Sequence, residues 1–221
     1  ISVRAYRILK EADVIAGYTT YVELVRAEFQ DKEFCVSGMK REVERCQEVL
    51  ELASQGKKVA LISSGDSGIY GMAGIMLEVA MDSEIEVEVI PGITSTIAGA
   101  ALVGAPLMHD QVLISLSDLL TDWEVIKRRL EAAGQGDFVV SLYNPRSKKR
   151  VNQIQEAREI LLKYKKLSTP VALLRHIGRE GENYDLCTLE NFLDYEIDMF
   201  TIVLIGNSNS YIKNGKMITP R

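Results

Sequence analysis

Several features that would point to a particular class of protein are scarce in this sequence. The chain has only three cysteines, two histidines and one tryptophan among 221 residues. Cys35, Cys46 and Cys187 are widely spaced and form no C-x-x-C pair, so the sequence indicates neither a disulfide framework nor a zinc site. His109 and His176 have no partner at the spacing that a metal site needs on one element. We therefore expect free thiols and no bound metal.

Excess basic charge and long apolar runs are also missing. The 26 Lys and Arg residues against 31 Asp and Glu residues give a net charge of -5, which provides no general affinity for nucleic acid or for an anionic membrane. An anionic ligand would therefore need a local cluster of basic side chains. No apolar run is long enough to span a membrane, and residues 1–14 look like an amphipathic helix rather than a signal peptide. We expect a cytoplasmic protein that binds neither nucleic acid nor membrane.

The first half of the chain alternates between two kinds of pattern. Segments with helical spacing alternate with short apolar runs, and the helix over residues 41–56 stops at Gly56. Parallel strands need crossover connections, which are usually helices, so this alternation predicts a parallel sheet. The expected helices cover residues 2–12, 41–56 and 69–81, and the expected strands cover residues 13–17, 58–63 and 86–90.

The composition changes after a helix of small residues that ends near Gly104 and Pro106. We therefore expect a domain boundary near residue 108, with an N-terminal α/β domain over residues 1–108 and a C-terminal α/β domain over residues 109–221. The second half alternates less strictly, which predicts a mixed sheet. Its Asn214-Gly215 pair, between alternating apolar and polar residues, predicts a β-hairpin.

The segment "SSGDSGIYGMAG", residues 63–74, is the first candidate ligand-binding turn. It follows an apolar run, and ligands collect beyond the carboxyl ends of strands in open α/β sheets. Gly65 and Gly68 would let the backbone approach a ligand, and Asp66 could accept a hydrogen bond from it. The alternative is that Asp66 or Ser67 only caps a helix that starts near residue 69. The segment matches neither the Walker loop nor the G-x-G-x-x-G pattern.

A second strand-turn-helix junction lies at residues 91–106. Pro91 and Gly92 occupy the turn, and Thr94, Ser95 and Thr96 open the helix, where amides or hydroxyls could bind a ligand. Core packing alone would also explain the small residues 98–101.

Two further turns carry basic residues after apolar runs. Helix starts normally favour acidic residues, so a basic helix start at residues 146–150 indicates a carboxylate or phosphate site. The alternative is a solvated basic face. The cations of the two turns are Arg146, Lys148, Lys149 and Arg150, then Arg175 and Arg179, which flank His176.

Several long motifs in this order resemble the class III tetrapyrrole methyltransferases. They are "SSGDSGIYGMAG", "PGITSTIAGAALVGAPLMHDQVLISLSDLLTDWEVI", "SLYNPRSKKR", "HIGREGE" and "TIVLIGNS". Within that class, "GAPLMHD", "ISLSDLLT" and "YNPRSK" are similar to the C-17 methyltransferases that act on precorrin-3B or cobalt-factor III in cobalamin biosynthesis. The resemblance covers essentially the whole chain.

The resemblance implies two α/β domains with a cofactor cleft between them, and S-adenosylmethionine as the methyl donor, converted to S-adenosylhomocysteine. A carbon of the macrocycle attacks the methyl group, and ring contraction accompanies methylation. A sulfonium needs no Lewis acid to leave, so the protein mainly has to align the reactants and exclude water. The resemblance implies that the cofactor is bound by Gly65, Asp66, Ser67, Ile69, Tyr70, Thr94, Ser95, Tyr143, Asn144, Ala172 and Gly206.

The substrate of this family carries many carboxylates, which gives the two basic turns a role in an acidic protein. We expect Arg146, Lys148, Arg175 and Arg179 to bind the tetrapyrrole. We also expect a homodimer.

Ring contraction requires proton movement on a hydroxyl and a carboxyl group of the substrate. We take Asp66, His109 and Ser117 as the catalytic candidates, with Ser67, Asp110, Asp118 and His176 left open. His109 could act as a general base or bind the substrate's cobalt, but a lone histidine is more often structural.

Three alternative functions remain at this point. A sister enzyme would methylate another carbon of the same ring system, and a non-catalytic binding module would not turn over S-adenosylmethionine. A dinucleotide oxidoreductase is disfavoured, because the glycine pattern and the acidic residue that binds the ribose are not found.

One departure concerns the start of the sequence. Members of the family open with a strand and a G-x-G-P-G loop before the helix that here begins at Ile1. We expect about 15 to 20 further residues before Ile1 in the natural protein, the usual length of a strand and a turn. One of the runs 13–17 and 58–63 should then have no neighbouring strand on one side.

Overall fold

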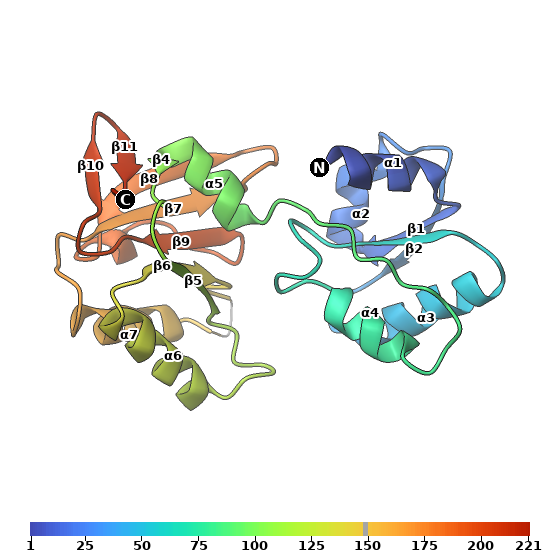
Figure 1. Cartoon of the computed structure of the whole chain (residues 1–221), viewed down its shortest axis with the longest axis horizontal. Helices are drawn as coiled ribbons and strands as arrows, with labels where there is room; N and C mark the ends of the chain where they lie inside the picture. The colour runs from blue at the N-terminus through green and yellow to red at the C-terminus, as the bar shows by residue number, and fades with distance from the viewer. Residues whose placement is uncertain (148–149) are drawn as a thin grey trace. The chain divides into compact units, whose positions relative to one another are not determined.

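The computed structural model describes residues 1–147 and 150–221. These residues form two compact units, residues 1–94 and residues 95–221, and each unit is described by itself. In both units helices flank a β-sheet, so the predicted α/β class is confirmed (Figure 1).

The first unit is a three-stranded parallel sheet with helices on both faces. Its strands lie in the order β2-β1-β3, and β3 forms one edge of the described sheet, as expected for one of the two runs. The elements are α1 (Val3–Glu11), β1 (Val14–Tyr18), α2 (Thr19–Arg26), β2 (Glu33–Ser37), α3 (Glu42–Ser54), β3 (Val59–Ile62) and α4 (Ala73–Ala80).

The alternation of β1 explains why this sheet is covered on both sides. Ile15 packs in a cluster with Leu9 of α1 and Phe29, whereas its neighbour Ala16 packs in a second cluster with residues of α3 and α4. Successive side chains of a strand point to opposite faces, so one short strand supplies both cores. The four residues Val14, Ile15, Ala16 and Val22 are fully buried.

Three predictions for the first unit differ from the structure. Helix α4 begins at Ala73 rather than near residue 69, because residues 63–72 form a turn. Residues 86–90 were predicted as a strand, but they form no strand, since no described strand pairs with them. Helix α2 and strand β2 were missed, because both are short and β2 has no clear alternation.

The second unit contains a five-stranded mixed sheet in the order β5-β6-β9-β7-β8. Strands β5 and β6 are parallel, and β9 runs antiparallel to both β6 and β7, so the predicted mixed sheet is confirmed. The elements are α5 (Ser95–Val103), β4 (Gly104–Ala105), β5 (Gln111–Ser115), α6 (Trp123–Gln135), β6 (Val139–Tyr143), α7 (Gln153–Leu162), β7 (Pro170–Arg175), β8 (Asn183–Thr188), the 3-10 helix Phe192–Asp194, β9 (Thr201–Ile205), β10 (Tyr211–Lys213) and β11 (Lys216–Ile218).

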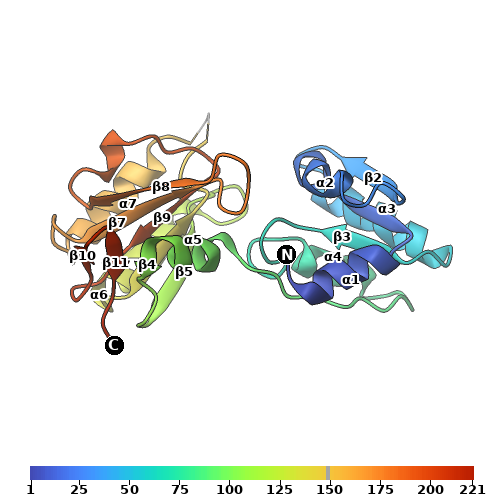
Figure 2. The same cartoon turned by 90° about the horizontal axis from the view of Figure 1, so that it is seen from above.

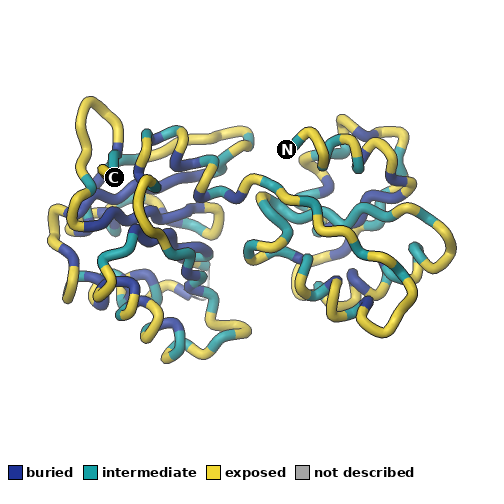
Figure 3. Tube along the Cα trace, in the orientation of Figure 1, coloured by how far each residue is buried: buried dark blue, intermediate teal, exposed yellow. Residues whose placement is uncertain are grey.

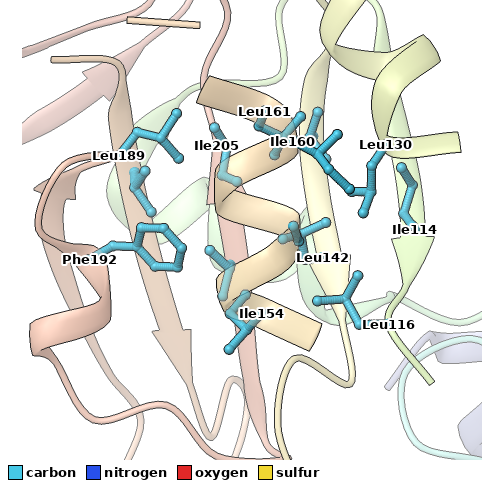
Figure 4. Close-up of a cluster of buried hydrophobic side chains, with 14 of the residues drawn as sticks. Ile114, Leu116, Leu130, Leu142, Ile154, Ile160, Leu161, Leu189, Phe192 and Ile205 are labelled. Atoms are coloured by element: carbon cyan, nitrogen blue, oxygen red, sulfur yellow. The ribbon is translucent and has the colours of Figure 1, made fainter. Parts of the chain in front are cut away.

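The main core of the second unit lies between this sheet and helices α6 and α7. Figure 4 shows Leu142 of β6 and Ile205 of β9 facing Ile154, Ile160 and Leu161 of α7. The central strands are buried along their whole length, as the dark trace in Figure 3 shows. Burial on both faces accounts for their continuous apolar sequences.

The other face of the sheet is covered by α5. A Cβ on Gly99 would lie 2.5 Å from Cδ1 of Leu174 in β7, so the helix packs closely where it has no side chain. The predicted hairpin is confirmed, with Asn214 and Gly215 both at positive φ between β10 and β11. Strand β11 also pairs with β4, which follows α5 directly (Figure 2).

The chain divides into its two units before the small-residue helix α5. The two units divide between Thr94 and Ser95, whereas the sequence predicted a boundary near residue 108. Helix α5 packs on β7 and β4 pairs with β11, so the small-residue helix belongs to the second unit. The change in composition after Pro106 follows the helix and does not mark the division.

Candidate functional site

The turn after β3 is tied to the Pro91-Gly92 turn by one carboxylate. Asp66 Oδ1 accepts a hydrogen bond from the Gly68 amide at 2.8 Å, and Asp66 Oδ2 accepts one from the Gly92 amide, also at 2.8 Å. Because α4 begins at Ala73, Asp66 is not the N-cap of that helix. We call residues 63–72 and 91–94 the glycine loop pair.

The backbones of the glycine loop pair touch directly. A Cβ placed on Gly92 would lie 1.9 Å from the carbonyl oxygen of Gly65, and one placed on Gly71 would lie 2.6 Å from the carbonyl oxygen of Ser67. Only glycine fits at such positions. Gly65 and Tyr70 have positive φ and are exposed, so the turn presents its backbone at the surface of the unit.

The remaining predicted cofactor residues of the first unit lie in the same loops. Ser67 and Ile69 are partly exposed within the turn, and Thr94 is buried. The structure therefore brings Gly65, Asp66, Ser67, Ile69, Tyr70 and Thr94 together in one loop pair. Ser95, the next residue, begins α5 in the second unit.

In the second unit, the face of the sheet toward α5 carries two predicted cofactor residues and two unpartnered hydroxyls. The hydroxyl of Tyr143 accepts a hydrogen bond from the Thr96 amide at 3.2 Å. Ala172 lies on the same face as Ser141, because both pair with Leu204 of β9. Thr96 Oγ1 and Ser141 Oγ are buried with no hydrogen-bond partner in the described structure.

Gly206 lies at the other end of these strands. It follows β9 next to the start of β6, where its amide donates to the Pro170 carbonyl and its carbonyl accepts from Lys165 Nζ at 3.0 Å. Because Ile205 pairs with Val140, Gly206 lies opposite Val139 of β6. Val139 is four residues from Tyr143, or about 13 Å along the strand. Only an extended ligand could contact both ends.

A polar cluster lies where β5 and β6 end side by side. Asn144 Nδ2 donates to Ser115 Oγ at 3.0 Å, and the Arg150 guanidinium donates to the Asn144 carbonyl at 2.9 Å and to Ser117 Oγ at 3.4 Å. Arg150 Nη1 also lies 4.0 Å from Asp118 Oδ1. We call Ser115, Ser117, Asp118, Asn144 and Arg150 the Arg150 cluster.

The sequence predicts the basic residues of the turn at 146–150, but it does not show which of them is buried. Arg150 is only 8% exposed, so it forms part of the support for this turn, whereas Arg146 is exposed. Lys148 and Lys149 lie outside the described residues. A basic residue just before a helix was the available signal, but its burial depends on contacts with Ser117, 33 residues earlier.

The two arginines predicted after β7 have different surroundings. Arg175 is buried, and its guanidinium donates to the Glu196 carbonyl, to Asn183 and to Asp185 at 2.7 Å. Arg179 is partly exposed, and its guanidinium lies 5.6 Å from the centre of the Phe200 ring. The ring of His176 stacks on the ring of Phe200, with 5.6 Å between the ring centres. Phe200 was not among the residues predicted from the sequence.

Two of the three predicted catalytic residues, His109 and Ser117, lie at opposite ends of β5. His109 is exposed before the amino end of β5, where its Nδ1 accepts from the Asp110 amide at 2.9 Å. Ser117 lies beyond the carboxyl end of the same strand, so five strand residues, roughly 17 Å, separate the two. Asp66 belongs to the first unit.

Metal-binding clusters and membrane-spanning helices are both missing from the described residues. Over residues 1–147 and 150–221, no group of three or more His, Cys, Asp or Glu side chains is arranged to hold a metal ion. In the same part of the chain, no helix has the length and apolar character needed to cross a membrane.

The described residues thus form two α/β units, and the glycine loop pair belongs to the first of them. The sequence model of the tetrapyrrole (corrin/porphyrin) methylases matches residues 1–193, and the chain belongs to this family. The family predicted from the sequence motifs is therefore confirmed.

Three relatives within the family match most or all of the chain. A probable cobalt-factor III C(17)-methyltransferase of Salmonella typhimurium is 49% identical over 100% of this chain and 92% of its own length. The cobalt-factor III methyltransferase of Priestia megaterium is 47% identical, and the chain spans 42% of it. The precorrin-3B C(17)-methyltransferase of Sinorhizobium sp is 39% identical over 89% of this chain and 79% of its own length.

Solved structures share the fold. The methyltransferase CobJ superposes with a TM-score of 0.92 at 32% identity, covering 100% of this chain and 93% of its own. The uroporphyrin-III C-methyl transferase of Thermus thermophilus complexed with S-adenyl homocysteine has a TM-score of 0.72 at 20% identity, covering 93% of this chain and 90% of its own. The second likeness shows the fold alone.

Proposed function

We propose that this protein is an S-adenosylmethionine-dependent methyltransferase of cobalamin biosynthesis. It methylates carbon 17 of cobalt-factor III or precorrin-3B, and ring contraction accompanies the methylation. The observation that carries this proposal is the 49% identity to the Salmonella protein over the whole chain and 92% of that relative. Membership of the tetrapyrrole methylases supports a tetrapyrrole substrate.

The described residues fit S-adenosylmethionine as the cofactor, which supplies a methyl group on a positively charged sulfur when bound. The contact between Gly92 and Gly65 leaves backbone, not side chains, where a ligand would approach the loops. Thr96 Oγ1 and Ser141 Oγ have no partner in the described structure, and buried hydroxyls normally have one. These two hydroxyls support a polar ligand on the α5 side of the second sheet.

We assign cofactor binding to the residues predicted from the sequence, with different roles. The glycine loop pair holds the cofactor through its backbone, and Asp66 keeps the two loops in register. Tyr143 and Ala172 contribute from the face that carries the unpartnered hydroxyls. The proposed set is Gly65, Asp66, Ser67, Ile69, Tyr70, Thr94, Ser95, Tyr143, Asn144, Ala172 and Gly206.

The substrate's carboxylates would be bound by cations that remain accessible. Arg146 and Arg179 are at least partly exposed, so they can reach a ligand, and we assign them to the substrate together with Lys148. Arg175 already donates to Asp185 and two oxygen atoms of other residues, so we assign it a supporting role. Asp66, His109 and Ser117 remain our catalytic candidates; His109 is exposed, and its Nδ1 lies 3.9 Å from Asp110 Oδ2.

The direct test is methyl transfer from labelled S-adenosylmethionine. The protein is incubated with cobalt-factor III, and separately with precorrin-3B, and with S-adenosylmethionine carrying a ¹³C methyl group. We expect one labelled methyl group on carbon 17 of at least one substrate, seen by NMR, and one S-adenosylhomocysteine formed per product. Label on another ring carbon would identify a sister enzyme, and no transfer to either substrate would contradict the proposal.

We also propose that the protein is a cytoplasmic homodimer. All three cysteines are free thiols, which is typical of a reducing compartment. Light scattering coupled to size-exclusion chromatography should give a mass near twice the 24.7 kDa of the chain. A mass of one chain would exclude the dimer.

A further inference from the structure

The guanidinium of Arg150 is unusual among the buried arginines. Its side chain is only 9% exposed, yet its Nε has no hydrogen-bond partner in the described structure. Arg45 and Arg175 are equally buried, but the Nε of Arg45 donates to Ser37 Oγ at 2.6 Å and that of Arg175 donates to the Glu196 carbonyl at 2.9 Å. Arg150 is therefore buried without the hydrogen bond at Nε that Arg45 and Arg175 both make.

Burying a charge with incomplete pairing costs free energy of folding. Arg175 has Asp185 at 2.7 Å, whereas the carboxylate nearest to Arg150, Asp118, is 4.0 Å away. Removing a guanidinium from water costs several kcal/mol, and incomplete pairing leaves part of that cost unrecovered. Stability alone does not explain a basic residue at this position, whereas its contacts orient a neighbouring hydroxyl.

The contact with Ser117 fixes the direction of a proton. Arg150 has only donors, so in the 3.4 Å contact Ser117 Oγ must be the acceptor. The O–H of Ser117 must then point away from the guanidinium, and Ser117 is partly exposed. The neighbouring Ser115 Oγ accepts from the Ser117 amide at 3.2 Å and from Asn144, which fixes the backbone beneath Ser117.

The segment after Ser117 has the character expected beside a large apolar ligand. Asp118 is held by Gln153, whose Nε2 donates to its Oδ2 at 2.8 Å. The next two residues, Leu119 and Leu120, are 71% and 97% exposed. The base of this loop is thus anchored by polar contacts, while its outer part presents two leucines that a macrocycle could cover.

We propose that Arg150 is a positioning residue that fixes the Ser117 hydroxyl as a hydrogen-bond donor to an oxygen atom of the bound tetrapyrrole. This inference rests on the proposed function. Arg150 acts from beneath Ser117, because its side chain is only 9% exposed whereas Ser117 is partly exposed. Asn144, whose carbonyl accepts from Arg150, keeps the guanidinium in place.

A double-mutant cycle tests whether Arg150 acts through Ser117. The variants are Ser117→Ala, Arg150→Gln and the double variant, assayed for kcat and KM with cobalt-factor III. We expect Ser117→Ala to lower kcat at least about 10-fold, since a donor aimed at a reacting oxygen is worth this much or more. Arg150→Gln should lower kcat similarly, and the double variant should be no worse than Ser117→Ala within about 2-fold.

Arg158 provides the matched control, because its guanidinium donates to the Leu189 and Glu190 carbonyls and, among the described residues, to no other group. Arg158→Gln should lower the melting temperature and leave kcat unchanged. All variants should bind S-adenosylhomocysteine as the wild type does. If Arg150→Gln does not fold, Arg150→Lys replaces it: Lys keeps the charge without the planar fork, and the same cycle with Ser117→Ala applies.

The outcomes separate this inference from the proposed function. Three results would each overturn the positioning role. The first is a double variant whose loss of kcat is the product of the losses in the two single variants. The others are a wild-type kcat in Ser117→Ala and an Arg150 variant that behaves like Arg158→Gln. No methyl transfer by the wild-type protein would instead overturn the proposed function, and this inference with it.

Discussion

Asp66 shows how much of a binding loop can depend on one side chain. Its two carboxylate oxygens each accept an amide, one from its own turn and one from Gly92, 26 residues away. The local contact alone would be an ordinary turn. The second contact joins two loops that the sequence connects only through α4 and the segment that follows it.

Substitutions at Asp66 should weaken cofactor binding in a graded way. Asp66→Ala removes both acceptors and should weaken S-adenosylhomocysteine binding at least about 10-fold, or about 1.4 kcal/mol. Asp66→Asn keeps one oxygen and should fall between Ala and the wild type. Calorimetry gives the affinities, and Asp82→Asn, at an exposed position of the same unit, is the control. Unchanged affinity in a folded Asp66→Ala variant would reduce Asp66 to a structural role.

Residue identities were more predictable than residue partners. The sequence singled out Asp66 and the basic turn at residues 146–150, since both follow apolar runs. It could not show that Asp66 reaches Gly92, or that Arg150 is buried under Ser117, because both contacts join segments far apart in the chain. His109 and Ser117 were grouped as catalytic, although the length of β5 separates them.

At the scale of elements, the glycine loop pair depends on backbone contact. Gly92→Ala would put a methyl group 1.9 Å from the Gly65 carbonyl oxygen, so one of the two loops must move. We expect a loss of roughly 1–3 kcal/mol in the stability of the first unit, as for other overpacked sites. The affinity for S-adenosylhomocysteine should fall more than about 10-fold, since about 1.4 kcal/mol is a factor of ten.

Gly74→Ala is the matched control for Gly92→Ala. Gly74 lies in α4, and a Cβ there meets no atom within 4 Å. Alanine favours a helix over glycine by about 1 kcal/mol, so this variant should be at least as stable as the wild type. Calorimetry and chemical unfolding measure both variants. If Gly92→Ala behaves like Gly74→Ala, the contact between the loops is unimportant.

Apolar runs predicted the sheet more reliably than alternation did. Strands β6, β7 and β9 are mostly apolar and buried along their whole length, and the mixed sheet that they form was expected. Residues 86–90 alternate between apolar and acidic residues, yet they form no strand, because a strand also requires a neighbour. Alternation reports a side-chain pattern and says nothing about available partners.

At the scale of the whole molecule, the two units have separate cores and different buried titratable groups. In the second unit, burial raises the pKa of the Cys187 thiol to about 12, with a further contribution from the charge of Asp185. Burial lowers the pKa of the Lys165 ammonium from its ordinary value of 10.5, although Asp137 partly opposes this effect. These two groups give the second unit opposite responses to alkaline pH.

The Cys187 thiol should make the second unit less stable as pH rises. An exposed thiol ionises near pH 9.0, whereas the folded unit keeps the proton on Cys187 to about pH 12. Between these values the unfolded chain binds fewer protons, so the free energy of unfolding contributed by this group falls with pH, by at most about 1.4 kcal/mol per pH unit. Below pH 9.0 the group adds no slope. Lys165 works in the other direction: between its lowered pKa and 10.5 the unfolded chain binds more protons, so its contribution rises with pH.

Cys187→Ala should therefore flatten the alkaline fall in stability. Denaturant unfolding at several pH values between 8 and 12 can be followed through the fluorescence of Trp123, the one tryptophan of the chain, which lies in the second unit. The small cavity left by the thiol lowers stability at every pH alike, so the slopes are compared and not the absolute values. Cys46→Ala, in the core of the first unit, is the control and should leave the slope seen by Trp123 unchanged. If Cys187→Ala keeps the wild-type slope, some other group governs the alkaline unfolding of this unit.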